Sequence, residues 1–127
     1  MKSTQSVILL ENLVCQENKI CRLKDRINWN YLDHELGHLF KSEHAPSSRL
    51  IFGLLYLQSI SNLHYLDMFS IWKDSPEWQY FCGEKYLNET YPLLDAPLSF
   101  WSHVIGEQGH LSMVRALGAW PPKETLH

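Results

Sequence analysis

The amino-acid sequence predicts an all-α protein, a compact multi-helix domain with a helix-turn-helix-like core. Apolar residues recur at the spacing of amphipathic helices through most of the 127 residues. Glycine and proline number only six each, which disfavours a chain of many short strands. No segment shows the strict alternation of apolar and polar residues that is typical of a half-buried strand. With 45% hydrophobic residues, the chain can bury one sizeable core.

The first third of the chain predicts three helices in succession. Residues 7–15 are typical of a short helix, and the apolar residues of segment 18–27 lie at helical spacing. Asn28 is a suitable N-cap for a third helix over 29–40, whose apolar residues follow a 3.6-residue rhythm.

The expected helix-turn-helix-like core follows a polar turn over residues 41–46. Ser47 or Ser48 can cap a helix over 49–60, which is apolar nearly all round and is therefore expected to be central and buried. Ser61 and Asn62 interrupt the helical pattern after residue 60. Asn62 can cap the next helix, over 63–72. A helix, a short break and a second helix are compatible with a helix-turn-helix, although any helical hairpin gives the same pattern.

Shorter elements are expected after Pro76. Residues 77–81 predict one more turn or short helix, and segment 83–97, with one glycine and two prolines, is typical of a loop. A helix over 98–105 is stopped by Gly106, and a last helix follows over 107–117. The domain is therefore assigned to residues 1–117, and residues 118–127 to an irregular tail.

The charge distribution restricts where nucleic acid would bind. The net charge is −3, unlike that of a strongly basic DNA-binding protein. Residues 1–73 hold eight Lys and Arg against seven Asp and Glu, whereas residues 74–127 hold three against seven. The one basic cluster consists of Lys19, Arg22, Lys24 and Arg26. A solvated helix face explains such a cluster more often than DNA binding does.

The cysteines and the apolar segments bear on the cellular compartment. Cys15, Cys21 and Cys82 form an odd set without a CxxC pair, so we expect reduced thiols rather than a disulfide framework. The sequence has no convincing signal peptide and no apolar run near the ~20 residues that a membrane span needs. We therefore expect a cytoplasmic protein that does not bind membranes. No cofactor is expected, because no phosphate-binding glycine loop is present.

Residues 34–38, HELGH, match the HExxH motif of zinc proteases, in which two histidines one helical turn apart bind the metal and the glutamate acts as a general base. His44 stands where the longer form of the motif has its third ligand. The glycine of that longer form is Lys41 here, which resists the required positive φ. His34 and His38 also fall nearly opposite the apolar face of their helix, so the sequence predicts an exposed pair and no bound metal.

Four blocks of sequence follow one another between about residues 27 and 113. They are INWNYLDHELGHLFKS (27–42), PSSRLIFGLLYL (46–57), IWKDSPEWQYFCGE (71–84), and Trp101 with IGEQG (105–109). Together they resemble the N-terminal domain of IS-five-like (InsH-like) insertion-sequence transposases. In that family, an ordinary helix without the two histidines occupies the place of HELGH.

The resemblance implies a helical, helix-turn-helix-like domain that recognises transposon-end DNA or helps to assemble the transposase. In the family, a ribonuclease-H-like domain with three Mg²⁺-binding acidic residues follows. The chain ends before such a domain, so we expect a truncated or stand-alone domain without catalysis. Around Trp101 the family usually carries several Arg or Lys, where this sequence has Phe100, Ser102, His103 and Val104. Fewer phosphate contacts imply weak DNA binding.

The side chains expected to contact DNA are those of Lys19, Arg22, Lys24, Arg26, Arg49 and Lys73. The first alternative is a protein–protein interaction module, in which the acidic, aromatic second half packs against another copy, an intact transposase or another partner. The second alternative is a zinc metalloprotease built on His34, Glu35, His38 and His44, which the observations on helix phase and Lys41 disfavour.

Overall fold

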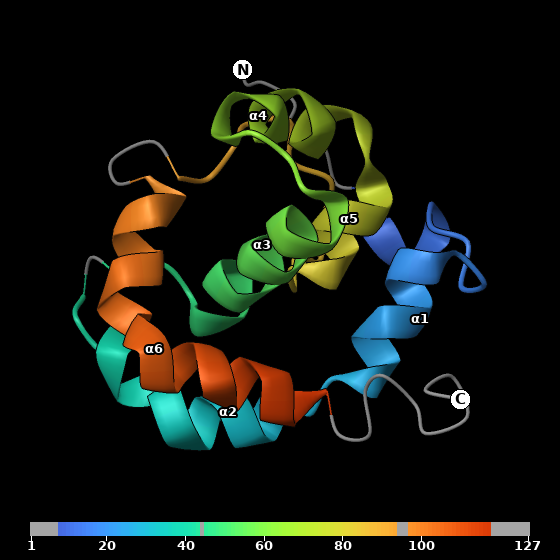
Figure 1. Ribbon diagram of the computed structural model, residues 1–127. Coiled ribbons are helices and arrows are strands. Elements are labelled where there is room, and N and C mark those ends of the chain that lie inside the picture. Colours follow the sequence, from blue (N-terminus) through green and yellow to red (C-terminus); the bar gives the residue numbers. More distant parts are fainter. Residues whose placement is uncertain (1–7, 44, 94–96, 118–127) are drawn as a thin grey trace.

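The computed structural model describes residues 8–43, 45–93 and 97–117. These residues form six α-helices and two short 3-10 helices, and their one strand-like pairing is an isolated bridge between Leu9 and Tyr86. Figure 1 shows the helices wrapped around a central one, α3 (Ser48–Ser61). The predicted all-α fold is confirmed.

The N-terminal segment differs from the helix expected over 7–15. Residue 7 lies outside the described residues, and only Leu10–Asn12 form a single 3-10 turn, η1. The reason is a long-range pairing, because the Leu10 N–H donates to the Lys85 carbonyl at 2.9 Å and the Leu87 N–H donates to the Ile8 carbonyl at 3.0 Å. Backbone groups that pair across the fold in this way are not available to a local helix.

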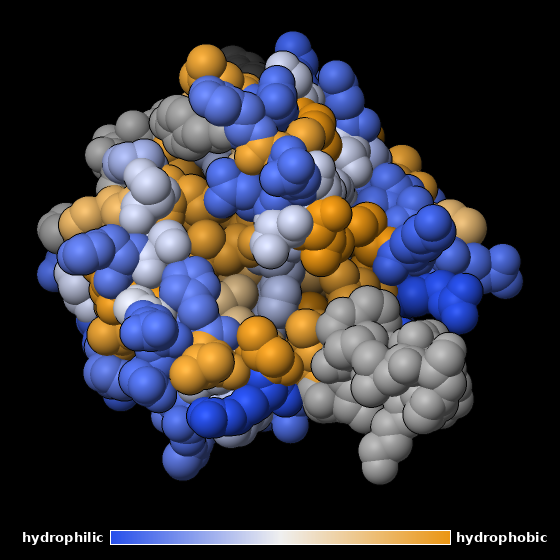
Figure 2. Space-filling view, in the orientation of Figure 1, coloured by the Kyte–Doolittle hydropathy of each residue, from blue (hydrophilic) through white to orange (hydrophobic). Residues whose placement is uncertain are grey.

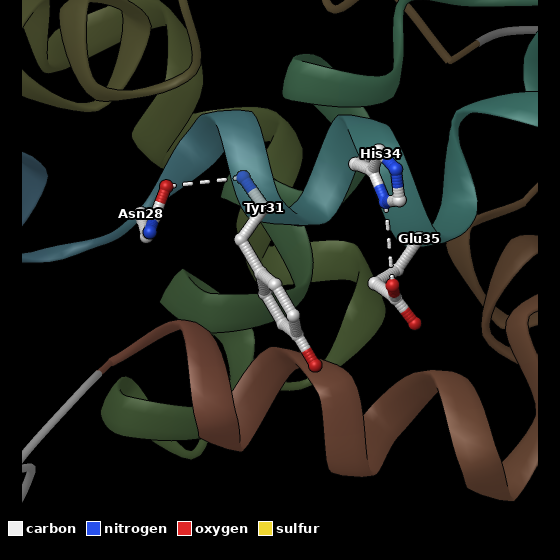
Figure 3. Close-up of polar contacts among 4 residues, drawn as sticks. All are labelled: Asn28, Tyr31, His34 and Glu35. Carbon is white, nitrogen blue, oxygen red and sulfur yellow. Dashed lines mark hydrogen bonds and ion pairs between the residues drawn. The ribbon is translucent and has the colours of Figure 1, made fainter.

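The next two helices begin where the sequence predicts. Helix α1 spans Lys19–Arg26, and α2 spans Trp29–Leu36. Asn28 caps α2, since its side-chain oxygen accepts from the Tyr31 N–H at 3.0 Å (Figure 3). The expected continuation to residue 40 tightens into a 3-10 helix, η2, over Gly37–Phe40.

Helix α3 is the centre of the core, as its composition predicts. Ser47 caps it by accepting from the Leu50 N–H at 3.1 Å, and every residue from 50 to 57 is buried. Asn62 does not cap the following helix, contrary to expectation. It adopts a left-handed conformation (φ 51°, ψ 49°) that ends α3, a conformation asparagine tolerates better than most residues. His64 instead caps α4 (Tyr65–Asp74), which starts two residues later than expected.

The remaining helices close the core. Helix α5 spans Pro76–Phe81 with Ser75 as its cap, and α6 spans Leu98–Ala116. Gly106 (φ 72°, ψ 176°) separates α6 into two helical halves, where the sequence predicts a stop. Figure 1 shows α6 lying beside α2.

Two hydrogen bonds fix the second half of α6. The Asn28 N–H donates to the Ala116 carbonyl at 2.8 Å, and the buried Tyr56 hydroxyl donates to the Met113 carbonyl. Tyr56 belongs to α3, so these bonds join α6 to both of its neighbours. The expected tail over 118–127 lies outside the described residues.

Candidate nucleic-acid interface

Arg49, the arginine of the PSSRLIFGLLYL block, is packed into the junction of three helices. Its guanidinium carbon lies 3.9 Å from the centre of the Trp29 ring, and its Nε donates to the Phe81 carbonyl at 3.2 Å. Burial lowers the pKa of the guanidinium from its ordinary value, because the charged form loses contact with water. This arginine therefore joins α2, α3 and α5.

The glycine one turn later lets α3 approach the end of α5. A Cβ atom at Gly53 would lie 2.7 Å from the Cys82 Sγ and 3.0 Å from its Cα. At Gly83 the φ of 91° suits glycine, and a Cβ there would lie 2.7 Å from the Arg49 Cγ. The second and third sequence blocks thus meet at one tightly packed contact.

Trp72 and Gln79, from the third sequence block (71–84), bind the loop that follows this block. Gln79 is completely buried, and its side chain donates to the Trp72 carbonyl and accepts from the Asn88 N–H, both at 2.8 Å. The Trp72 indole N–H donates to the Asn88 carbonyl at 3.0 Å. A buried amide with both ends paired thus holds Asn88 of the following loop against α4 and α5.

Three of the predicted DNA-contacting residues form an exposed row on α1. Lys19, Arg22 and Arg26 are spaced three and four positions apart, so they share one side of the helix. They border a hollow of about 740 Å³. Its apolar lining comes from α1, α3 and the residue after α6, and includes Ile20, Leu23, Tyr56, Ile60 and Leu117. Figure 2 shows apolar side chains on this face between these helices.

The other three predicted residues lie elsewhere. Lys24 is on the opposite side of α1, with its Nζ 4.9 Å from the centre of the Tyr80 ring, and it lines a smaller pocket together with Arg49. Lys73 is exposed in the last turn of α4 and lines neither hollow. Lys85 joins the smaller pocket, and sequence reasoning missed it because nothing marks a single lysine in a loop.

The two histidines and the glutamate of HELGH are exposed, and the helix phase predicts this for His34 and His38. The His34 side chain is 84% exposed, and its Nδ1 lies 3.4 Å from a carboxylate oxygen of the 42% exposed Glu35 (Figure 3). His38 falls in η2 rather than in α2, and His44 lies outside the described residues. Among the described residues, no group of three or more His, Cys, Asp and Glu is placed to hold a metal ion.

The first half of α6 presents a mixed surface of aromatic and polar side chains. The Trp101 ring stacks on Phe40 with centroids 5.2 Å apart, whereas Phe100 is half exposed. The Ser102 hydroxyl and carbonyl lie 3.1 and 3.2 Å from the His110 Nε2, which links the two halves of α6 across Gly106.

Comparison with known proteins places these features in a family. The chain is 27% identical over 109 residues to "Uncharacterized protein ORF8 in nfe locus" of Rhizobium meliloti, an alignment covering 84% of this chain and 53% of that protein. The chain thus spans about half the length of this relative. No solved structure matches this chain.

No helix in the described part of the chain is both long and apolar enough to cross a membrane.

The family comparison covers more of the N-terminus than the four blocks do. The family described as "Transposase domain (DUF772)" matches residues 8–100, which include α1 as well as the first three blocks. Trp101 and the last block lie beyond the end of this match. Because the match spans well over half of the 127 residues, the chain belongs to this transposase-domain family.

Proposed function

We propose that this chain is the DNA-contacting domain of an IS-five-like transposase, that it helps to hold transposon-end DNA, and that none of its described residues cuts the strand. The observation that carries the proposal is the exposed row of Lys19, Arg22 and Arg26 on α1, a helix inside the matched range. Cations at helical spacing neutralise neighbouring phosphates and so supply sequence-independent affinity.

The charge of α4 favours α1 as the helix that faces DNA. If α3 and α4 acted as a helix-turn-helix, α4 would enter the major groove. Its exposed charged residues are Asp67, Lys73 and Asp74, which carry a net charge of −1. Two carboxylates near the phosphates would oppose binding, so we assign DNA contact to α1 rather than to α4.

Substitution of the cationic row tests this assignment. A random-sequence 30-base-pair duplex serves as the probe, with binding followed by fluorescence anisotropy at 50 mM salt. We expect Lys19→Gln/Arg22→Gln/Arg26→Gln to weaken binding at least thirtyfold. Each phosphate contact that is lost removes the favourable release of a counterion from the DNA. Lys41→Gln removes one exposed lysine that borders neither hollow and is the matched control. Equal binding by the triple variant and the unsubstituted protein would overturn the assignment.

A second candidate function is protein–protein association through α6, which three exposed apolar residues favour. Phe100, Leu111 and Val114 are 50%, 43% and 57% exposed, and the last two lie three positions apart on one side of the helix. Light scattering coupled to gel filtration tests this candidate. If the protein is a dimer that Leu111→Ser/Val114→Ser converts to a monomer, and if it binds no duplex at 50 mM salt, the interaction function replaces DNA binding.

A further inference from the structure

A small polar pocket lies behind the cationic row, on the other side of α1. Its volume is about 220 Å³, below the 300–1,000 Å³ of pockets for drug-sized ligands. It is lined from four segments of the chain, namely Leu9, Glu11, Lys24, Arg49, Tyr80, Gly83, Glu84 and Lys85. A pocket of this size accommodates a single compact polar group.

The charges around the pocket favour an anion with one negative charge. Lys24, Arg49 and Lys85 supply three positive charges, and Glu11 and Glu84 supply two negative ones. Among the described side chains, the only ion pair within 4 Å joins His34 and Glu35, so direct contact neutralises none of these five charges. The pocket therefore keeps an excess of one positive charge around a space that the protein does not fill.

Arg49 supplies a fixed positive charge at the wall of this pocket. The Trp29 ring and the Phe81 carbonyl hold its guanidinium in place, as described above. Its Nη2 is buried and meets no hydrogen-bond acceptor among the described residues. No acidic side chain among the described residues pairs with this guanidinium, so its positive charge favours an anion at the pocket wall. Because Gly83 has no side chain, the Arg49 Cγ packs closely against it.

We propose that this pocket binds one phosphate group, held by Arg49, Lys24 and Lys85, and that the phosphate belongs to the DNA backbone. The second part rests on the proposed DNA-binding function. A backbone phosphodiester carries one negative charge, which matches the excess of the pocket, and its oxygens accept hydrogen bonds from guanidinium and ammonium groups. Because Lys24 lies opposite the row of Lys19, Arg22 and Arg26, the site would anchor a phosphate that this row does not reach.

Titration with inorganic phosphate at pH 7 tests the pocket without DNA. We expect phosphate, but not sodium chloride at the same ionic strength, to shift the backbone NMR signals of Gly83, Glu84 and Lys85. The Lys24→Gln/Lys85→Gln variant should lose these shifts, and Lys41→Gln should keep them. Arg49 is left intact because its packing supports the fold. Shifts that are absent, spread over the whole surface or retained by the double variant would overturn the proposed site.

Binding of the 30-base-pair duplex then identifies the source of the phosphate. If the phosphate is that of DNA, the double variant should bind the duplex about tenfold more weakly at 50 mM salt, and DNA should shift the same three signals. Phosphate-induced shifts together with unchanged duplex binding would overturn the DNA source and assign the pocket to free phosphate. Failure of the protein to bind any duplex would overturn the proposed function, whereas the phosphate titration would still decide whether the site exists.

Discussion

Single residues of the second and third blocks have packing roles that composition does not reveal. The sequence predicts that Arg49 contacts DNA, whereas the structure places its guanidinium on Trp29 and beside the Phe81 carbonyl. Gly53 and Gly83 each occupy a position where a Cβ atom would come within 2.7 Å of a neighbour. The block resemblance could find these residues, but the contacts that need them come from segments about thirty positions apart in sequence.

The contact at Gly53 predicts a large effect of one methyl group. We expect Gly53→Ala to lower the free energy of unfolding by about 1–3 kcal/mol, because the added atom meets the Cys82 Sγ and backbone. Urea denaturation measures this change. Gly37→Ala is the matched control, since nothing lies within 4 Å of its Cβ position and its φ is −58°. Equal destabilisation by the two substitutions would contradict the close approach of α3 and α5.

Glu84 has a carboxyl group that is partly buried without an ion pair to a described residue. Burial raises its pKa, because the charged form loses water. A folded-state pKa above the unfolded value means that the native state binds the extra proton, so stability falls as the pH rises between these two values. We therefore expect Glu84→Gln to stabilise the fold at pH 7 and to have little effect well below pH 4. Equal effects of this substitution at both pH values, in urea denaturation, would contradict the burial of Glu84.

Whole elements were predicted better than their ends. Periodicity and caps locate α1, α2, α3 and α5, and a single glycine marks the division of α6. The prediction of a helix over 7–15 is wrong, because the backbone of this segment pairs with residues 85 and 87. Local spacing of apolar residues does not show such long-range pairing. Of the six predicted DNA contacts, three share the α1 row. Lys24 and Arg49 instead line a pocket together with Lys85, and these three residues are brought together only by the fold.

The packing of α1 against α5 predicts how the three thiols react. Cys21 of α1 and Cys82 after α5 are buried, and burial raises the pKa of both thiols, whereas Cys15 is exposed. With Ellman's reagent at pH 8, we expect one thiol to react at once and two to react only when the protein unfolds. Three rapidly reacting thiols would mean that α1 does not stay packed on α5.

At the scale of the whole molecule, opposite faces of α1 carry different arrangements of positive charge. One face presents Lys19, Arg22 and Arg26 beside an apolar hollow, and the other directs Lys24 to the pocket of Arg49. A chain with a net charge of −3 can therefore still offer a local cationic surface. Family membership and this surface together favour DNA contact through α1.

The salt dependence of duplex binding tests whether the cationic row of α1 contacts DNA. The logarithm of the association constant falls with the logarithm of salt concentration by about 0.9 for each phosphate neutralised. For Lys19→Gln/Arg22→Gln/Arg26→Gln, we predict a slope that is shallower by about 2–3 than that of the unsubstituted protein, with Lys41→Gln unchanged. A slope near zero for the unsubstituted protein, or the same steep slope for the triple variant, would contradict the assignment of DNA contact to α1.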